Sequence, residues 1–244
     1  MRHRQPFASS AAPKPAAGSR PREPHEAASV RSPTKVDAPG GPAINLHLYL
    51  LRHATHADYG RRLTGRAPGV PLTPEGERQA MALGRRLASE NLAEIQTSPR
   101  ERARATALAV SQATGAPVTV ADALDEIDFG AWTGTDFAAL EGQTDWEAWN
   151  ASRSTARTPG GESMSEASDR IAGHVDSLLA TRPGERIALV THCDMIRALV
   201  ARTLGLSLDN LLRFEVGPAS LSRLEAGAWG AKVLSLNETA RDDA

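Results

Sequence analysis

The chain has 244 residues, 41% of them hydrophobic, and a formal net charge of −1 at pH 7. This balance gives no electrostatic reason to expect nucleic acid or a membrane as a partner, and no apolar run reaches the roughly 20 residues of a transmembrane helix. The single cysteine, Cys193, excludes an internal disulfide and a cysteine-cluster metal site. We therefore expect a cytoplasmic protein.

The first 43 residues differ in composition from the rest. They hold 8 of the 16 prolines and a formal charge of about +4, against about −5 for the remaining chain. Most of their hydrophobic residues are alanine, which buries little area, so the segment cannot offset its ordering entropy. We expect a disordered tail over residues 1–43 and a folded domain over residues 44–240.

Short apolar runs alternate with helical periodicity through that domain. The expected strands lie at residues 46–51, 94–97, 117–121 and 187–190, with two more near 219–225 and 232–236 that form a hairpin through the Ala226-Gly227 region. Thr73 and Pro74 begin the first helix as N-cap and first helical residue. Ser98 and Glu101 have the spacing of a capping box and begin the second.

Two later helices are predicted by apolar stripes. Their stripes contain Ile171, Val175, Leu178 and Leu179 in one case, and Ile196, Leu199, Val200 and Leu204 in the other. Residues 129–162 hold three of the four tryptophans and read as an irregular excursion with short helices. Strand–helix alternation predicts an α/β fold, a three-layer sandwich whose central sheet is mostly parallel and has helices on both faces.

Polar side chains follow the ends of these strands, where ligands bind in such sheets. They are Arg52-His53, then Arg100 and Arg102, then Asp125-Glu126, and finally Thr191-His192-Cys193-Asp194. Arginines match a phosphate by charge-assisted hydrogen bonds, and a helix N-terminus favours an anion. A neutral imidazole can attack phosphorus, and a carboxylic acid can protonate the leaving oxygen. A metal site is the competing use of two histidines and an acid, but the flanking arginines would repel a cation.

At these residues the chain resembles the histidine phosphatase superfamily, in its phosphoglycerate mutase-like branch. The resemblance covers about residues 46–225 and consists of six blocks in order. The blocks are Leu51-Arg52-His53, Leu72-Thr73-Pro74-Glu75-Gly76, Ser98-Pro99 with Arg102-Ala103, Leu124-Asp125-Glu126 with Gly130, Pro159-Gly160-Gly161-Glu162-Ser163, and Thr191-His192 with Ile196-Arg197.

The resemblance implies a role for each matching residue. His53 would be the nucleophile that becomes phosphorylated, and Glu126 the proton donor and later the base. Arg52, Arg102 and His192 would hold the phosphoryl oxygens. No metal and no organic cofactor is implied. Asp125 and Asp128 compete with Glu126 for the acid role, and we favour Glu126.

The chain also departs from the common pattern. The family usually has Gly-Glu-Thr after the histidine and an asparagine six residues after it, where this chain has Ala54-Thr55-His56 and Tyr59. The phosphate contact of that asparagine is therefore open, with Tyr59 or a backbone group as possible substitutes. We place His56, Tyr59, Arg66 and Glu162 at the substrate pocket. Arg100 is expected at the surface, with a second anionic group of the substrate as its alternative partner.

Three functions remain to be separated. The leading hypothesis is a phosphomonoester hydrolase acting on a small phosphorylated metabolite. The second is a phosphoglycerate-type mutase. The segment after Glu126, Ile127-Asp128-Phe129-Gly130, argues against it, because it contains an acid where the cofactor-dependent mutases of the family carry basic residues. The third is a silent domain that binds phosphorylated ligands. The substrate and the oligomeric state stay open.

Overall fold

The computed structural model of the chain describes residues 45–239. The tail predicted over residues 1–43 lies outside the described residues, as do the predicted domain limits at 44 and 240. Within the described part, no helix is long and apolar enough to cross a membrane.

A six-stranded sheet forms the centre of the described domain, in the order β4-β3-β6-β1-β7-β8. The strands are β1 (Leu46–Arg52), β3 (Glu94–Thr97), β4 (Val118–Val120), β6 (Arg186–Thr191), β7 (Ser220–Gly227) and β8 (Gly230–Thr239). The first four run parallel to one another, whereas β7 is antiparallel to both β1 and β8. Because β6 lies between β1 and β3, the residues that follow these three strands meet at one edge of the sheet.

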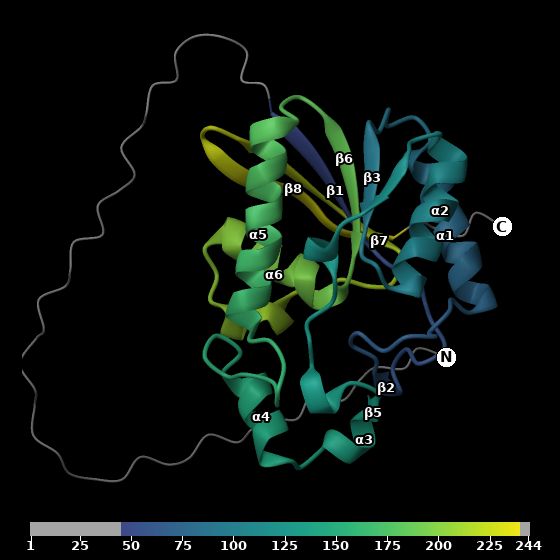
Figure 1. Cartoon of the computed structure of the whole chain (residues 1–244). Coiled ribbons are helices and arrows are strands. Elements are labelled where there is room, and N and C mark those ends of the chain that lie inside the picture. The colour runs from purple at the N-terminus through teal and green to yellow at the C-terminus, as the bar shows by residue number, and fades with distance from the viewer. Residues whose placement is uncertain (1–44, 240–244) are drawn as a thin grey trace, which may run out of the picture. The chain divides into compact units, whose positions relative to one another are not determined.

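Helices cover both faces of this sheet (Figure 1). Helices α1 (Pro74–Leu87) and α2 (Glu101–Thr114) pack on one face, and α5 (Met164–Thr181) and α6 (Cys193–Leu204) on the other. Side chains of β1 alternate between the two layers: Leu48 and Leu50 pack with the α5 and α6 side, Tyr49 and Leu51 with the α1 and α2 side. The predicted three-layer α/β fold is confirmed.

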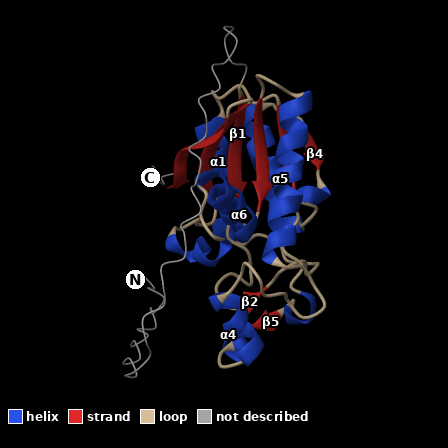
Figure 2. Cartoon of the chain, turned by 90° about the vertical axis from the view of Figure 1, so that its left-hand side faces the viewer, coloured by secondary structure: helices blue, strands red, loops and turns tan. Residues whose placement is uncertain are grey.

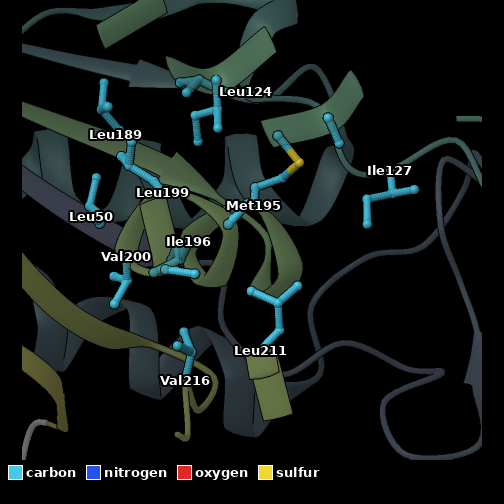
Figure 3. Packing of buried hydrophobic residues seen from close by; sticks show 14 of the residues in the cluster. Leu50, Leu124, Ile127, Leu189, Met195, Ile196, Leu199, Val200, Leu211 and Val216 are labelled. Atoms are coloured by element: carbon cyan, nitrogen blue, oxygen red, sulfur yellow. The ribbon is translucent and has the colours of Figure 1, made fainter. Parts of the chain in front are cut away.

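The layer under α6 is densely apolar and supports the site above it (Figure 3). Met195, Ile196, Leu199 and Val200 of α6 belong to one buried apolar cluster with Leu50 and other side chains of the sheet, and each is at most 5% exposed. A helix packed this closely cannot shift without opening a cavity. The N-terminal residues of α6, and His192 directly before it, are therefore held in place.

Helix α2 begins differently from the prediction. Its N-cap is Arg100, and no side chain caps it, so the capping box expected from Ser98 and Glu101 is wrong. The Ser98 hydroxyl has a partner elsewhere, because it accepts and donates hydrogen bonds in the site. A capping box does form at α5, between Ser163 and Glu166.

The acidic loop, residues 125–128, leads into the excursion of residues 129–162. The excursion lies beyond the carboxyl ends of the parallel strands (Figure 2). It contains β5 (Thr135–Asp136), which pairs with β2 (Arg62–Leu63), and the helices α3 (Phe137–Leu140) and α4 (Thr144–Ala151). No local sequence pattern indicates the β2–β5 pair. Trp132, at most 6% exposed, meets Trp146 and Trp149 edge-on, with ring centroids 5.4 and 6.4 Å away. These rings form the core of the excursion.

Candidate active site

His53 is the first residue after β1, and neighbouring strands fix its backbone. Its N–H donates to the Thr191 carbonyl at 3.0 Å, and its carbonyl accepts from the Ala219 N–H at 3.3 Å. The residue is 3% exposed. The imidazole therefore occupies one position at the edge where β1 and β6 end.

The hydrogen bonds of His53 define its tautomer. Nδ1 lies 2.9 Å from the Ala54 carbonyl, which can only accept, so Nδ1 carries the proton. Nε2 therefore has the free lone pair, and the Arg102 Nε–H donates to it at 3.2 Å. Burial, followed by the charges of Arg102 and Arg52, lowers the pKa of His53 well below 6.5. The ring is neutral at pH 7, with a nucleophilic nitrogen beside a guanidinium.

Arg102 connects two histidines from different strand ends. Its Nη2 donates to the Gly65 carbonyl at 2.8 Å and lies 3.1 Å from His192 Nδ1. Burial lowers the pKa of Arg102 to about 10, so the side chain is still charged at pH 7. Its Nη1 and the Nε of Arg52 are buried without a hydrogen-bond partner in the described part of the chain. Unpaired cationic donors of this kind fit an anionic ligand.

His192 has the opposite tautomer. Because Arg102 can only donate, His192 Nδ1 accepts, and the proton lies on Nε2, which donates to Ser98 Oγ at 2.8 Å. Ser98 Oγ in turn donates to Asp125 Oδ1 at 3.3 Å. The His192 ring is fully buried, 5.1 Å from the His53 ring between centroids, and burial lowers its pKa well below 6.5. A neutral ring with a fixed orientation results.

Glu126 is the carboxyl group nearest to this pair. Its Oε2 lies 3.7 Å from His192 Nδ1, and its Oε1 accepts from the Ile127 N–H at 3.0 Å. Burial, followed by the charge of Asp194, raises the pKa of Glu126 to about 7. A carboxyl group with this pKa can both give and take a proton near neutral pH. Of its two competitors, Asp125 is bonded to Ser98, and the Asp128 side chain is 42% exposed.

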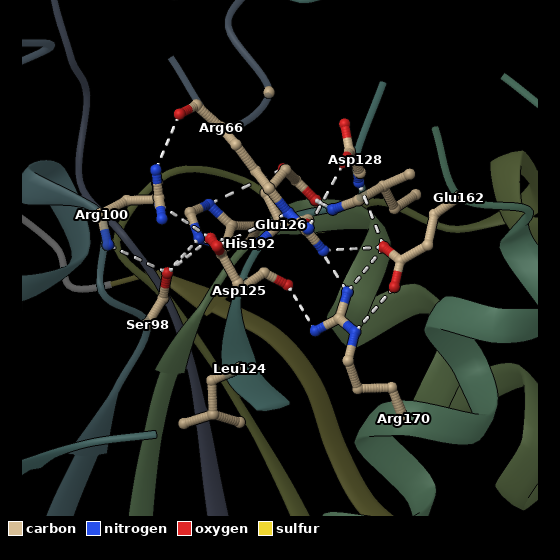
Figure 4. A network of polar contacts seen from close by, with 12 residues as sticks. Arg66, Ser98, Arg100, Leu124, Asp125, Glu126, Asp128, Glu162, Arg170 and His192 are labelled. Carbon is tan, nitrogen blue, oxygen red and sulfur yellow. Dashed lines mark hydrogen bonds and ion pairs between the residues drawn. The ribbon is translucent and has the colours of Figure 1, made fainter. Parts of the chain in front are cut away.

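Two arginines fix the acidic loop from outside (Figure 4). Arg66 Nε donates to the Glu126 carbonyl at 2.7 Å, and Arg170 Nη1 donates to the Asp125 carbonyl at 2.9 Å. Glu162 binds both guanidinium groups, at 2.9 Å in each case, and accepts from the Asp128 N–H at 3.1 Å. Arg66 and Glu162, predicted at the substrate pocket, are thus occupied by contacts that hold the loop. Their contact with substrate stays a prediction.

Glycines permit the close approach of the two loops in this network. A Cβ on Gly130, whose φ is +53°, would lie 2.0 Å from the Pro159 carbonyl oxygen. A Cβ on Gly161 would lie 2.1 Å from the Asp128 carbonyl oxygen. Any side chain at either position would push the 158–162 segment away from the loop that carries Glu126.

The remaining predicted residues lie around this centre. His56 is 7% exposed with its ring centroid 5.2 Å from that of His53, and Tyr59 is 47% exposed with its ring 5.4 Å from the Arg52 guanidinium carbon. Arg100, expected at the surface, is only partly exposed: its Nη1 donates to the Arg66 carbonyl at 2.7 Å. Burial raises the pKa of the Cys193 thiol to about 11, so it is not a nucleophile at pH 7.

Some residues of the site were missed by the sequence reasoning. The spacing of Ser98 predicts a helix cap instead of a site residue, and Arg170 lies on a helix more than 40 residues from the carbonyls it binds. Asp194 is named among the polar residues after the strand at 187–190 but given no role there; its side chain, 14% exposed, accepts a hydrogen bond from Arg153 Nη1 at 2.9 Å, and this arginine comes from the excursion. The signal for Asp194 was its position two residues after His192; none of the local patterns indicates Arg153 or Arg170.

The site has no arrangement typical of a metal centre. Among residues 45–239, no group of three or more histidine, cysteine, aspartate or glutamate side chains could hold a metal ion. The donors that converge on His53 are cationic or neutral N–H groups. Such a set binds and polarises an anion.

Comparisons with known proteins give a consistent family. The model of the histidine phosphatase superfamily (branch 1) matches residues 48–239. The probable phosphoglycerate mutase GpmB of Salmonella choleraesuis is 35% identical over 185 residues, which cover 74% of this chain and 85% of the relative. The structure of mycobacterial glucosyl-3-phosphoglycerate phosphatase is 26% identical, with a TM-score of 0.72, over 80% of this chain and 100% of that chain. The structure of a candidate α-ribazole-5′-phosphate phosphatase of Escherichia coli is 26% identical, with a TM-score of 0.72, over 82% of this chain and 99% of that chain.

Proposed function

Because this chain belongs to the histidine phosphatase superfamily, branch 1, and is an enzyme of the phosphatase type, we propose that it hydrolyses phosphomonoesters of small metabolites through a phosphohistidine formed on His53. One observation carries this proposal. His53 presents an unprotonated Nε2 at a point where Arg102 meets it, with its proton fixed on the other ring nitrogen by a backbone carbonyl.

The proposed first step transfers the phosphoryl group to the enzyme. The Nε2 lone pair of His53 attacks phosphorus, and the bond from phosphorus to the ester oxygen breaks. Glu126, protonated in part at pH 7 because its pKa is raised to about 7, gives its proton to the departing oxygen. Arg102 exchanges its hydrogen bond to Nε2 for one to a phosphoryl oxygen, and the Arg52 guanidinium neutralises the remaining charge. His192 is neutral, and its Nδ1 orients the Arg102 guanidinium by accepting a hydrogen bond from it.

The second step releases inorganic phosphate. The Glu126 carboxylate takes a proton from water, the water oxygen bonds to phosphorus, and the bond from phosphorus to Nε2 breaks. His53 is again neutral, and Glu126 is again protonated. The phosphoryl group thus reaches water without a metal ion or an organic cofactor in either step.

A mutase of the phosphoglycerate type is the second candidate. It is favoured by the name of the Salmonella relatives, which are probable phosphoglycerate mutases. Against it, the residues that directly follow Glu126, Ile127-Asp128-Phe129-Gly130, include an acid and no basic residue, so this segment supplies no cationic side chain to retain a bisphosphate. Hydrolysis is therefore the function that this site supports best, and a silent binding domain ranks below both.

The test is phosphate release from a panel of phosphomonoesters in EDTA. The panel contains 3-phosphoglycerate, glucosyl-3-phosphoglycerate, α-ribazole phosphate, nucleoside monophosphates and 4-nitrophenyl phosphate. We expect turnover by the wild type, loss in His53→Ala, and no loss in the control His47→Gln, a histidine on β1, the strand that ends directly before His53. Acid-labile and base-stable labelling of the enzyme by a ³²P-substrate would identify the phosphohistidine. Full activity of His53→Ala would refute the proposal, and isomerisation of phosphoglycerate faster than hydrolysis would favour the mutase.

A further inference from the structure

His53 has a second histidine beside it that the proposed mechanism does not use. His56 lies 5.2 Å from His53 between ring centroids, almost the same as the 5.1 Å between His53 and His192. The residue is only 7% exposed, although it lies next to the nucleophile. A buried imidazole ordinarily has partners for both nitrogens.

The local turn assigns one of those partners. The Asp58 N–H donates to His56 Nδ1 at 3.3 Å, so Nδ1 is the acceptor and the proton of the neutral ring lies on Nε2. Burial, then the charges of Arg102 and Arg52, lowers the pKa of His56 to about 4, although Asp58 raises it. The ring is neutral at pH 7, and Nε2–H has no hydrogen-bond partner among residues 45–239.

The backbone holds His56 firmly. His56 pairs with Leu72 in an isolated antiparallel bridge, and the Thr55 carbonyl accepts from the Thr73 N–H at 3.0 Å. A Cβ on Gly76 would lie 1.9 Å from the same carbonyl oxygen, which shows how closely helix α1 packs on this segment. The donor on His56 is therefore pre-positioned, as the donors on Arg52 and Arg102 are.

Two donors near the nucleophile, Arg52 Nε and Arg102 Nη1, are buried without a hydrogen-bond partner in the described part of the chain. His56 uses Nδ1 to accept from the Asp58 N–H, which leaves its Nε2–H available as a third donor. We propose that His56 Nε2–H binds a phosphoryl oxygen of the substrate, as a neutral donor beside the two arginines. This inference rests on the proposed function and adds a residue to the phosphate site. It also answers which residue takes over the contact left open at Tyr59.

Tyr59 is a weaker candidate for that contact. It is 47% exposed, and its ring lies 5.4 Å from the Arg52 guanidinium carbon and 6.2 Å from the His56 ring. These contacts use the faces and edges of the ring. The Tyr59 ring packs against Arg52 and His56 and restricts their movement. Under this proposal, the Tyr59 hydroxyl does not contact the phosphate.

The experiment compares two variants of equal size. His56→Gln keeps an N–H donor close to the position of Nε2, whereas His56→Met has a similar volume and no donor. Binding of inorganic phosphate is measured by calorimetry, together with thermal unfolding. We expect His56→Met to weaken phosphate binding about 10- to 100-fold, since a hydrogen bond to a charged acceptor contributes on this order, and His56→Gln and Tyr59→Phe to remain within about threefold of wild type.

This readout is independent of turnover, so a failure of the proposed hydrolysis and a failure of the His56 assignment give different results. Equal phosphate affinity in His56→Met and His56→Gln would overturn the assignment, as would a loss in Tyr59→Phe equal to that in His56→Met. If either His56 variant unfolds, the ¹⁵N spectrum of the wild-type imidazoles decides. His56 Nε2 should be protonated at pH 7 and shift on addition of phosphate, and an unprotonated or unresponsive Nε2 refutes the assignment.

Discussion

The hydrogen bond from His192 to Ser98 provides a direct test of the geometry at the centre of the site. Ser98 Oγ accepts from His192 Nε2 at 2.8 Å and donates to Asp125 Oδ1 at 3.3 Å, and both Ser98 and His192 are fully buried. In Ser98→Ala the Nε2–H group loses its acceptor and has no access to water. An unpaired buried donor costs about 1–3 kcal/mol, which for a domain of this size lowers Tm by about 2–12 °C.

A matched control exists in the same chain. Ser220 is also 0% exposed, but its hydroxyl has no hydrogen-bond partner within the described residues. Ser220→Ala removes the same oxygen without breaking a bond, so its unfolding free energy should change by less than about 0.5 kcal/mol or increase. The comparison separates the loss of the Ser98 hydrogen bonds from the loss of volume.

The assay is equilibrium urea unfolding of the three proteins, followed by tryptophan fluorescence. Ser98→Ala should also lower kcat, because without Ser98 the His192 proton can move to Nδ1, where it opposes the Arg102 donor. Equal unfolding free energies for Ser98→Ala and Ser220→Ala would refute the tautomer assigned to His192. The role derived for Ser98 would then be wrong.

Two further predictions concern the proton donor and the loop that carries it. Since the pKa of Glu126 is raised to about 7, the acid is protonated below that pH and ionised above it, so kcat for alkyl phosphates should fall as pH rises through 7. Glu126→Gln should abolish this fall in kcat at high pH and reduce kcat by about 100-fold for alkyl phosphates. The reduction should be far smaller for 4-nitrophenyl phosphate, because its leaving group needs no proton. An unchanged pH profile in the variant would exclude Glu126 as the acid. Glu162→Gln removes the charge that binds Arg66 and Arg170 and should lower kcat for alkyl phosphates about 10-fold with phosphate affinity unchanged, whereas Asp169→Asn, in the exposed pair with Arg202, should alter neither. If Glu162→Gln lowered the affinity for phosphate by the same factor as kcat, the role of Glu162 would not be limited to holding the Glu126 loop.

Local sequence patterns determined most of the fold. The segments at 46–51, 94–97 and 187–190 form strands within one residue of the predicted limits, and nearly all of their residues are buried, including the polar Glu94 and Gln96. Strand–helix alternation then requires a mostly parallel sheet. That sheet brings Arg52, His53, Arg102, Glu126 and His192 to one edge, as the order of the strand ends predicted.

Tertiary structure alone decided how those residues are used. Ser98 has the spacing of a helix cap, yet β6 lies between β1 and β3 and places His192 within 2.8 Å of its hydroxyl. A hydrogen bond to a buried imidazole outweighs a cap that water can replace. The contacts of Arg170 with the Glu126 loop depend on the packing of α5 against it, and the bond from Arg153 to Asp194 depends on the excursion folding back onto α6. Such partners lie about 40 residues apart in the sequence, so no local pattern encodes them, and only the packed chain brings them together.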